Sequence, residues 1–239
     1  MKIVKSENYK EMSLLASDMM IEALLRKPDA LFCIATGSSP TGAYRLFAER
    51  IKSENIDISR MRIIKLDEWC GLPKDNAATC EHYIAAHLLA PLGIPADSPR
   101  YISFDPLAKD SDAECARVSR LLHEAGGIDC CILGLGKNGH LGLNEPGKEP
   151  YPFAHQAALH AKTKTHAMLS ENGESVSAGY TLGIKDLLDS RQIILLATGA
   201  DKQEAYAGLQ SQTVSPECPA SFLWLHENSV CITDISSFA

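Results

Sequence analysis

The chain has 239 residues, of which 45% are hydrophobic and 22% are charged, and its formal net charge is −7. This length and composition are typical of one globular domain with a buried core, and they exclude a disordered chain. The negative charge argues against nucleic-acid and membrane partners, because polyanions and anionic lipid surfaces would repel the protein.

The cysteines and the N-terminal segment indicate a cytoplasmic protein without a metal site. The eight cysteines form no C-x-x-C pair and have no zinc-like spacing to the eight histidines, so we expect reduced thiols. The segment MKIVKSENYKEM lacks the apolar core of a signal peptide, and no run approaches the roughly 18 apolar residues of a membrane span. We expect residues 1–239 to form a single domain.

Short apolar runs alternate with helical patterns along the chain. The predicted strands cover residues 3–5, 30–36, 62–69, 129–136, 192–199 and 230–234, and the clearest helix covers residues 8–27. Strands without clean alternation, separated by helices, are typical of a parallel sheet that is covered on both faces. The predicted fold class is therefore α/β, with a doubly wound, mostly parallel sheet. Because ligands bind at the carboxyl ends of such strands, the segments that follow the strands are the places to seek a site.

Two of these segments have the form strand, Thr-Gly, helix. In ATGSSPTGAY, backbone amides at a helix N-terminus and the polar residues Thr36, Gly37, Ser38 and Ser39 are suited to a phosphate. A serine-capped polar turn explains the same residues, and the segment matches no nucleotide-binding motif. In ATGADKQEAY, Lys202 stands near a helix start, where a positive charge gains nothing from the helix dipole. A bound anion would explain it, and so would an ordinary surface lysine.

The predicted strand at residues 62–69 ends in adjacent carboxylates, Asp67 and Glu68. Neighbouring side chains of a strand point to opposite sides, so one carboxylate can face a pocket while the other makes a structural contact. A partly desolvated carboxylate at this place can act as a general base. A hydrated pair that caps the next turn is the alternative.

The segment GLGKNGHLGLNEP concentrates polar groups among glycines. The glycines allow the backbone to turn sharply and to approach a ligand, while Asn138, His140, Asn144 and Glu145 supply donors and acceptors. His140 beside Glu145 would be a polarised imidazole that passes protons near neutral pH. An ordinary core or surface histidine is the alternative.

Together, these segments resemble the glucosamine-6-phosphate deaminase family, within the larger group that also contains the 6-phosphogluconolactonases. LDEWCGLP is similar to the family's Asp-Glu-aromatic-x-Gly-Leu motif, and GKNGHLGLNEP is similar to its longer motif that ends in Asn-Glu-Pro. The two Thr-Gly segments match its phosphate-holding loops. YTLGIKDLLD and PASFLWLH are similar to the galactosamine-6-phosphate deaminase/isomerase branch. The resemblance covers nearly the whole chain.

The resemblance implies an enzyme of carbohydrate catabolism, without a cofactor, that isomerises and deaminates a hexosamine 6-phosphate. His140, oriented by Glu145 and Asn138, would open the pyranose ring, and Asp67 would move the C2 proton to C1 through an enolamine. Imine hydrolysis would then release ammonia and a ketose 6-phosphate. The residues implied to hold the phosphate are Thr36, Gly37, Ser38, Ser39 and Lys202. Galactosamine 6-phosphate, giving tagatose 6-phosphate, is the expected substrate, and glucosamine 6-phosphate, giving fructose 6-phosphate, is the alternative.

The chain departs from the family pattern at two places. Asn138 stands where some members have an aspartate, which leaves Glu145 as the charge partner of His140. The family's phosphate-binding arginine should fall near residues 162–169, where there is none, and we expect His166, or else Lys164, to replace it. Residues 147–177 would form a mobile lid over the sugar. A monomer or small homo-oligomer is expected.

Two rival functions remain open at the level of sequence. A 6-phosphogluconolactonase would use the histidine to activate water, but the motif of that group lacks the Asn-Glu-Pro ending. A catalytically inactive sugar-phosphate sensor would be expected to have lost Asp67 or His140, and both are present.

Overall fold

The computed structural model describes residues 1–147, 149–164, 167–170 and 175–235. Its main feature is a seven-stranded sheet with the order β1-β10-β9-β6-β2-β3-β5, and all of its strand pairings are parallel. The strands are β1 (Lys2–Lys5), β2 (Leu31–Ile34), β3 (Arg62–Lys65), β5 (Tyr101–Ile102), β6 (Cys130–Gly134), β9 (Ile193–Ala197) and β10 (Ser229–Thr233). The predicted α/β class with a mostly parallel sheet is confirmed.

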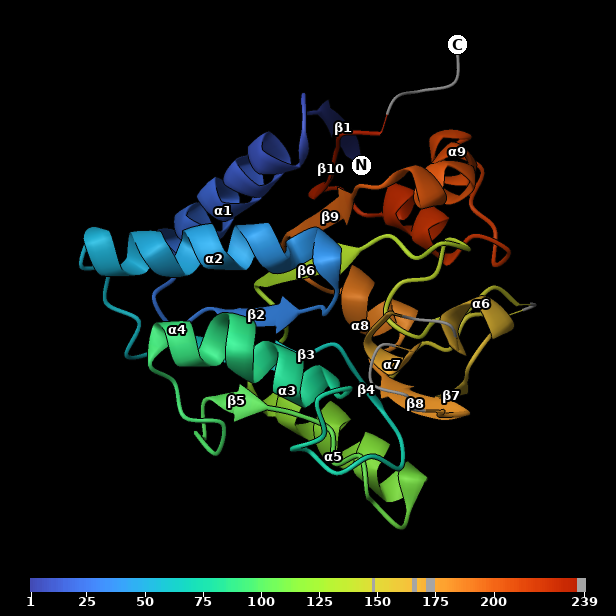
Figure 1. The fold of residues 1–239 in the computed structure, drawn as a ribbon, viewed down its shortest axis with the longest axis horizontal. Coiled ribbons are helices and arrows are strands. Elements are labelled where there is room, and N and C mark those ends of the chain that lie inside the picture. The colour runs from blue at the N-terminus through green and yellow to red at the C-terminus, as the bar shows by residue number, and fades with distance from the viewer. Residues whose placement is uncertain (148, 165–166, 171–174, 236–239) are drawn as a thin grey trace.

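Helices cover both faces of this sheet, as Figure 1 shows. One face packs against α1 (Tyr9–Arg26), α2 (Ser38–Ser53), and the continuous helical stretch of α3 (Cys80–Ile84), the π-helix η1 (Ala85–Leu89) and α4 (Ala90–Leu92). The other face packs against α5 (Ser111–Glu124), α8 (Ile184–Leu188), α9 (Gln203–Gln210) and the 3-10 helix η3 (Pro219–Leu225). A further 3-10 turn, η2 (Ala200–Lys202), precedes α9.

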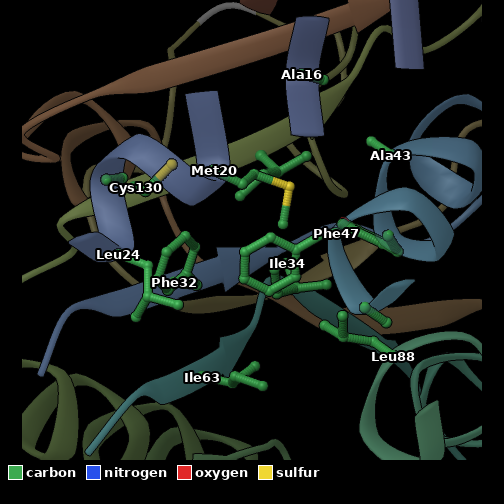
Figure 2. Close-up of a cluster of buried hydrophobic side chains, with 14 of the residues drawn as sticks. Ala16, Met20, Leu24, Phe32, Ile34, Ala43, Phe47, Ile63, Leu88 and Cys130 are labelled. Atoms are coloured by element: carbon green, nitrogen blue, oxygen red, sulfur yellow. The ribbon is translucent and has the colours of Figure 1, made fainter. Parts of the chain in front are cut away.

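The side chains of β2 explain why the strands show no polar alternation. Phe32 and Ile34 enter the core under α1 and α2, which Figure 2 shows in close-up, while Leu31 and Cys33 enter the core on the opposite face. Both sides of the strand are therefore buried, and both require apolar residues.

The helix predicted at residues 8–27 forms as α1. Its N-cap is Asn8, whose Oδ1 accepts a hydrogen bond of 3.0 Å from the amide of Glu11. This side-chain acceptor satisfies one of the amides that a helix N-terminus leaves unpaired. Among the described residues, no helix is long and apolar enough to cross a membrane.

A second, antiparallel sheet of three strands corrects one prediction. It has the order β4-β8-β7 and consists of β4 (Asp67–Trp69), β7 (His155–Ala158) and β8 (Ala178–Thr181). The single strand predicted at residues 62–69 is therefore wrong, because β3 and β4 belong to different sheets. Leu66 lies at the break: its amide donates to Ile34 beside β3, while its carbonyl accepts from Leu182 after β8. The backbone thus changes its hydrogen-bond partners from the main sheet to the small sheet at Leu66, and no glycine or proline in the sequence marks this change.

Part of the segment expected as a lid, residues 147–177, is regular structure. It contains β7, which pairs with β8, and the short helices α6 (Ala161–Lys164) and α7 (Ala167–Ser170). Figure 1 shows α6 and α7 beside the small sheet.

Candidate active site

A cavity of about 830 Å³ lies at the carboxyl ends of the central strands. Its lining includes residues that directly follow β2, β3, β6 and β9, the four places where polar segments were predicted to mark a site. The predicted site residues in the lining are Thr36, Gly37, Ser38, Ser39, Asp67, Asn138, His140 and Lys202. The parallel sheet thus brings segments that are far apart in the sequence to one edge.

The loop after β2 turns at Gly37, whose φ of 102° is in a region that favours glycine, and continues into α2. Two tyrosines from other helices hold its backbone carbonyls. The hydroxyl of Tyr9 donates to Ser38 O at 2.7 Å, and the hydroxyl of Tyr83 donates to Gly37 O at 2.7 Å. Burial raises the pKa of Tyr83 to about 12, so this group remains a neutral donor. The carbonyls are thereby occupied, and the amides at the N-terminal end of the 16-residue helix α2 are suited to bind an anion.

Lys202 joins this loop to the loop after β9. Its Nζ donates a hydrogen bond of 2.9 Å to Ser39 Oγ. Burial lowers the pKa of Lys202, the charge of Asp201 opposes this shift, and the nearby charge of Lys137 reinforces it. The ammonium group and the α2 N-terminus therefore form a positive region that suits a phosphate group.

Asp67 and Glu68 face opposite ways, as the alternation of a strand requires. Glu68 is buried behind the cavity wall, where its carboxylate accepts hydrogen bonds from the amides of Trp69, Cys80 and Glu81 and from Lys65 Nζ at 2.6 Å. Asp67, which is 8% exposed, lines the cavity. Glu68 is therefore a structural carboxylate, and Asp67 is the one that a ligand can reach.

The environment of Asp67 suits a base that works near neutral pH. Burial and the charge of Glu68 raise its pKa to about 7, although His140, Lys65 and a hydrogen bond from Cys80 act in the opposite direction. Its Oδ1 is buried and has no hydrogen-bond partner among the described residues. Such an oxygen can take a proton from a ligand without first breaking another hydrogen bond.

His140 on the opposite loop is held by a carboxylate. Its Nδ1 lies 3.2 Å from Glu145 Oε2, which also accepts a hydrogen bond of 2.9 Å from Asn138 Nδ2. Burial opposes ionisation of Glu145, but its contacts with His140, Thr163 and Asn138 outweigh burial and lower its pKa to about 2. Glu145 is therefore ionised at neutral pH, and it can orient the imidazole and stabilise its protonated form.

Gly136 provides the space for this imidazole. A Cβ atom at Gly136 would lie 2.0 Å from His140 Cδ2, a distance that no side chain can tolerate. Gly139 has a φ of 86°, a backbone conformation that favours glycine. The two positions thus require glycine for different physical reasons: Gly136 for space and Gly139 for its backbone conformation.

The remaining predicted residues have different outcomes. Glu145 lies behind His140, outside the cavity lining. His166 falls outside the described residues, and Lys164 is exposed and is not in the cavity lining. The expected replacement of the arginine by His166 therefore stays a prediction, and the alternative, Lys164, does not line the cavity.

Sequence reasoning missed several residues that line the cavity: Tyr9, Thr41, Tyr83, Lys137, Thr163 and Asp201. Thr163 Oγ1 lies 3.3 Å from His140 Nδ1, and Lys137 Nζ forms an ion pair of 2.9 Å with Asp201. Lys137 was detectable, because it stands inside the glycine-rich segment. Tyr9 and Thr163 come from elements whose position follows only from the tertiary structure. In the described part of the chain, no group of three metal-binding side chains is placed to hold an ion.

A model of the family "Glucosamine-6-phosphate isomerases/6-phosphogluconolactonase" matches residues 5–232. The chain is 43% identical over 226 residues to a protein of Escherichia coli (strain K12) named "Putative deaminase AgaI". The matched region covers 95% of this chain and 89% of the relative. It is 36% identical over 236 residues to a glucosamine-6-phosphate deaminase of Geobacillus sp. (strain WCH70). That match covers 98% of this chain and 93% of the relative.

A solved structure of similar fold is that of a monomeric glucosamine-6-phosphate deaminase of the NagB superfamily. The two structures have a TM-score of 0.92 at 30% sequence identity, over 98% of this chain and 97% of the other. The similarity of fold therefore extends over nearly the whole chain.

Proposed function

Because this chain belongs to the glucosamine-6-phosphate isomerase/6-phosphogluconolactonase family of enzymes, we propose that it is an amino-sugar 6-phosphate deaminase/isomerase that converts galactosamine 6-phosphate into tagatose 6-phosphate and ammonia. One observation carries the proposal: the buried carboxylate of Asp67, which has a pKa of about 7 and an Oδ1 without a hydrogen-bond partner among the described residues, shares a cavity with an imidazole held by an ionised glutamate. This pair supplies a base for a carbon acid and a proton carrier for ring opening.

The first step is opening of the pyranose ring. Nδ1 of His140 is engaged by Glu145, which leaves Nε2 for the substrate. Nε2 takes the proton of the C1 hydroxyl and returns a proton to the ring oxygen, so that the C1–O5 bond breaks and an aldehyde forms. Glu145 stabilises the imidazolium between these two transfers.

The second step is isomerisation. Asp67 removes the C2 proton, which the neighbouring C1 carbonyl makes acidic. The electron pair forms the C1–C2 double bond of an enolamine as the C1=O double bond opens onto its oxygen, which takes up a proton released by the substrate's ammonium group. The protonated Asp67 then delivers the proton to C1, and the nitrogen remains on C2 as an imine. Water adds to C2, the C–N bond breaks, and ammonia leaves with a ketose 6-phosphate as the product. The phosphate, held by the loop of Thr36–Ser39 and by Lys202, supplies the binding energy that positions C2 against Asp67.

The preference for galactosamine rests on the resemblance of YTLGIKDLLD and PASFLWLH to the galactosamine-6-phosphate deaminase/isomerase branch. Glucosamine 6-phosphate is the alternative, because other similar relatives are named glucosamine-6-phosphate deaminases. We also propose a cytoplasmic protein of one domain that is a monomer or a small homo-oligomer, with residues 147–177 as a lid. Thr163 and Met168 support the lid, since both come from this segment and line the cavity.

Ammonia release from the purified protein tests the proposal, with galactosamine 6-phosphate, glucosamine 6-phosphate and 6-phosphogluconolactone at matched concentrations. A higher kcat/KM for galactosamine 6-phosphate is expected, and a higher value for its epimer would assign the alternative substrate. Since the lactone yields no ammonia, its hydrolysis is followed by acid release. Hydrolysis of the lactone with no release of ammonia from either amino sugar would overturn the proposal.

A further inference from the structure

The positive groups at the phosphate end of the cavity are two lysines from different loops. Lys202 follows β9, and Lys137 follows β6 in the glycine-rich segment; both line the cavity. Their charges are close enough for Lys137 to contribute to the lowered pKa of Lys202. Two ammonium groups held near each other are unfavourable in an empty site, and a bound anion relieves this repulsion.

Asp201 balances part of this charge. Its Oδ2 lies 2.9 Å from Lys137 Nζ, and the pKa of Asp201 is lowered, chiefly by this hydrogen bond. Both side chains are about half exposed, 56% for Lys137 and 54% for Asp201. Exposed ion pairs contribute little to stability, so little free energy is lost when Lys137 exchanges Asp201 for a stronger hydrogen-bond acceptor.

A phosphate monoester is such an acceptor. It carries a charge of about −1.5 to −2 at pH 7 and offers three strong acceptor oxygens. Lys202 supplies one positive charge and one ammonium donor group, and Ser39 Oγ is already its partner. Among the described residues of the cavity lining there is no arginine, and Lys137 is the one lysine besides Lys202.

We propose that Lys137 is a second phosphate-binding residue, which leaves Asp201 and pairs with the 6-phosphate of the substrate. Asp201 holds the ammonium group at the mouth of the phosphate site until substrate arrives. The inference rests on the proposed function for the identity of the phosphorylated sugar, but not for the presence of a phosphate site.

Binding of inorganic phosphate, measured by isothermal titration calorimetry, tests the site without any turnover. Lys137→Met is expected to weaken phosphate binding about tenfold and to raise KM for the amino-sugar phosphate by a similar factor, because one charge-assisted hydrogen bond is lost. Lys137→Arg is expected to retain binding within about threefold, since a guanidinium suits phosphate at least as well. Unchanged phosphate affinity in Lys137→Met would overturn the inference.

The variant Asp201→Asn tests whether Lys137 contacts the phosphate directly or only neutralises the charge of Asp201. When Lys137 contacts the phosphate, the Asn variant binds phosphate more tightly than wild type, because the lysine is no longer held and a negative charge is removed. In the double variant with Lys137→Met, affinity falls below that of Asp201→Asn alone. Equal affinities of the double variant and of Asp201→Asn would mean that Lys137 only neutralises Asp201, and would overturn the inference.

Lys185→Met is the matched control. Lys185 forms an exposed ion pair of 2.8 Å with Asp189, with exposures of 54% and 60%, and lies outside the cavity lining. Its loss is expected to leave phosphate affinity and KM unchanged. Phosphate binding that depends on Lys137, in a protein that releases no ammonia, would support this inference and contradict the proposed function, so the two failures are distinguishable.

Discussion

Asp67 is the residue whose ionisation should set the pH dependence of the reaction. A base must be deprotonated, and burial together with Glu68 raises the pKa of Asp67 to about 7. We expect kcat/KM to rise through about pH 7 and to level off above it. Asp67→Asn should abolish solvent-deuterium incorporation at C2 while phosphate binding is retained. Exchange at C2 that persists in this variant would contradict the role.

The same titration predicts an effect on stability. Between its ordinary pKa of 3.8 and its native pKa of about 7, Asp67 holds a proton in the folded state that the unfolded chain has released. Its ionisation therefore makes folding less favourable as the pH rises through this window. Asp67→Asn, which cannot ionise, should raise the Tm at pH 8 and leave it nearly unchanged at pH 4. Asp189→Asn, at an exposed carboxylate, is the control for this comparison of melting curves.

Gly136 is predicted to be essential for the position of the imidazole. In Gly136→Ala the new methyl group overlaps His140, which must move away from Glu145. Loss of general acid–base catalysis should lower kcat by about 100-fold or more. Gly134→Ala is the matched control, because a Cβ there meets only Ser39 Cβ at 3.9 Å, an ordinary contact. Equal turnover by the two variants would argue against a role of His140 in ring opening.

Which site residues were predictable follows from where they lie in the chain. Thr36, Asp67, His140 and Lys202 lie in the segments that follow apolar strands, so the rule for parallel sheets was sufficient to group them. Thr163 reaches His140 from the short helix α6, between β7 and β8 of the small sheet, and no local pattern predicts where that helix lies.

At the scale of elements, a buried ion cluster joins β3, β4 and α3 beneath the cavity. Lys65 Nζ lies 2.6 Å from both Glu68 and Glu81, and its side chain is fully buried. Burial favours loss of its proton, but the two carboxylates outweigh burial and raise the pKa of Lys65. The cluster thereby fixes the start of β4, where Asp67 stands.

Lys65→Met should be strongly destabilising, because it leaves two buried carboxylates without a counter-charge. The expected loss is about 3–5 kcal/mol in the free energy of unfolding. Urea denaturation at pH 7 measures it, with Lys185→Met as a surface control that should stay within about 0.5 kcal/mol of wild type. A loss no larger than that of the control would mean that the cluster contributes no net stability.

The elements also differ in how well the sequence predicts them. The strands of the main sheet other than β5 were predicted because continuous apolar runs are typical of strands that are buried on both faces. The two-residue strand β5 was missed, since it is too short to give a pattern. β7 and β8 were missed, since HQAA and AGYT are short and weakly apolar and their pairing depends on β4. The break at Leu66 was missed for a related reason: the apolar pattern continues while the hydrogen-bond partners change.

At the scale of the whole molecule, the small sheet shares a core with the large one. The ring of Tyr180 in β8 stacks on the ring of Phe104, with 5.6 Å between the ring centroids. Both rings belong to the hydrophobic cluster that covers one face of the main sheet. Asn144 is buried between the active-site loop and the chain after β8, and its Nδ2 donates to Leu141 O and Leu182 O. These contacts predict that both sheets unfold as one cooperative unit.

The two tryptophans allow a test of this prediction. In Trp224→Phe, the only remaining tryptophan is Trp69 of β4, which reports on the small sheet. Its fluorescence should change at the same urea concentration as the far-UV circular dichroism of the same variant, which reports mainly on the helices. An earlier fluorescence transition would show that the small sheet unfolds separately.

The position of β1 at the edge of the main sheet has a consequence for how the protein is made. Its one neighbour in the strand order is β10, and the two pair from Lys2 with Val230 to Lys5 with Thr233. A ribosome synthesises β1 first and β10 last of these strands. During translation β1 therefore has no sheet edge to join, and the last strand to leave the ribosome is the one that completes the sheet between β9 and β1.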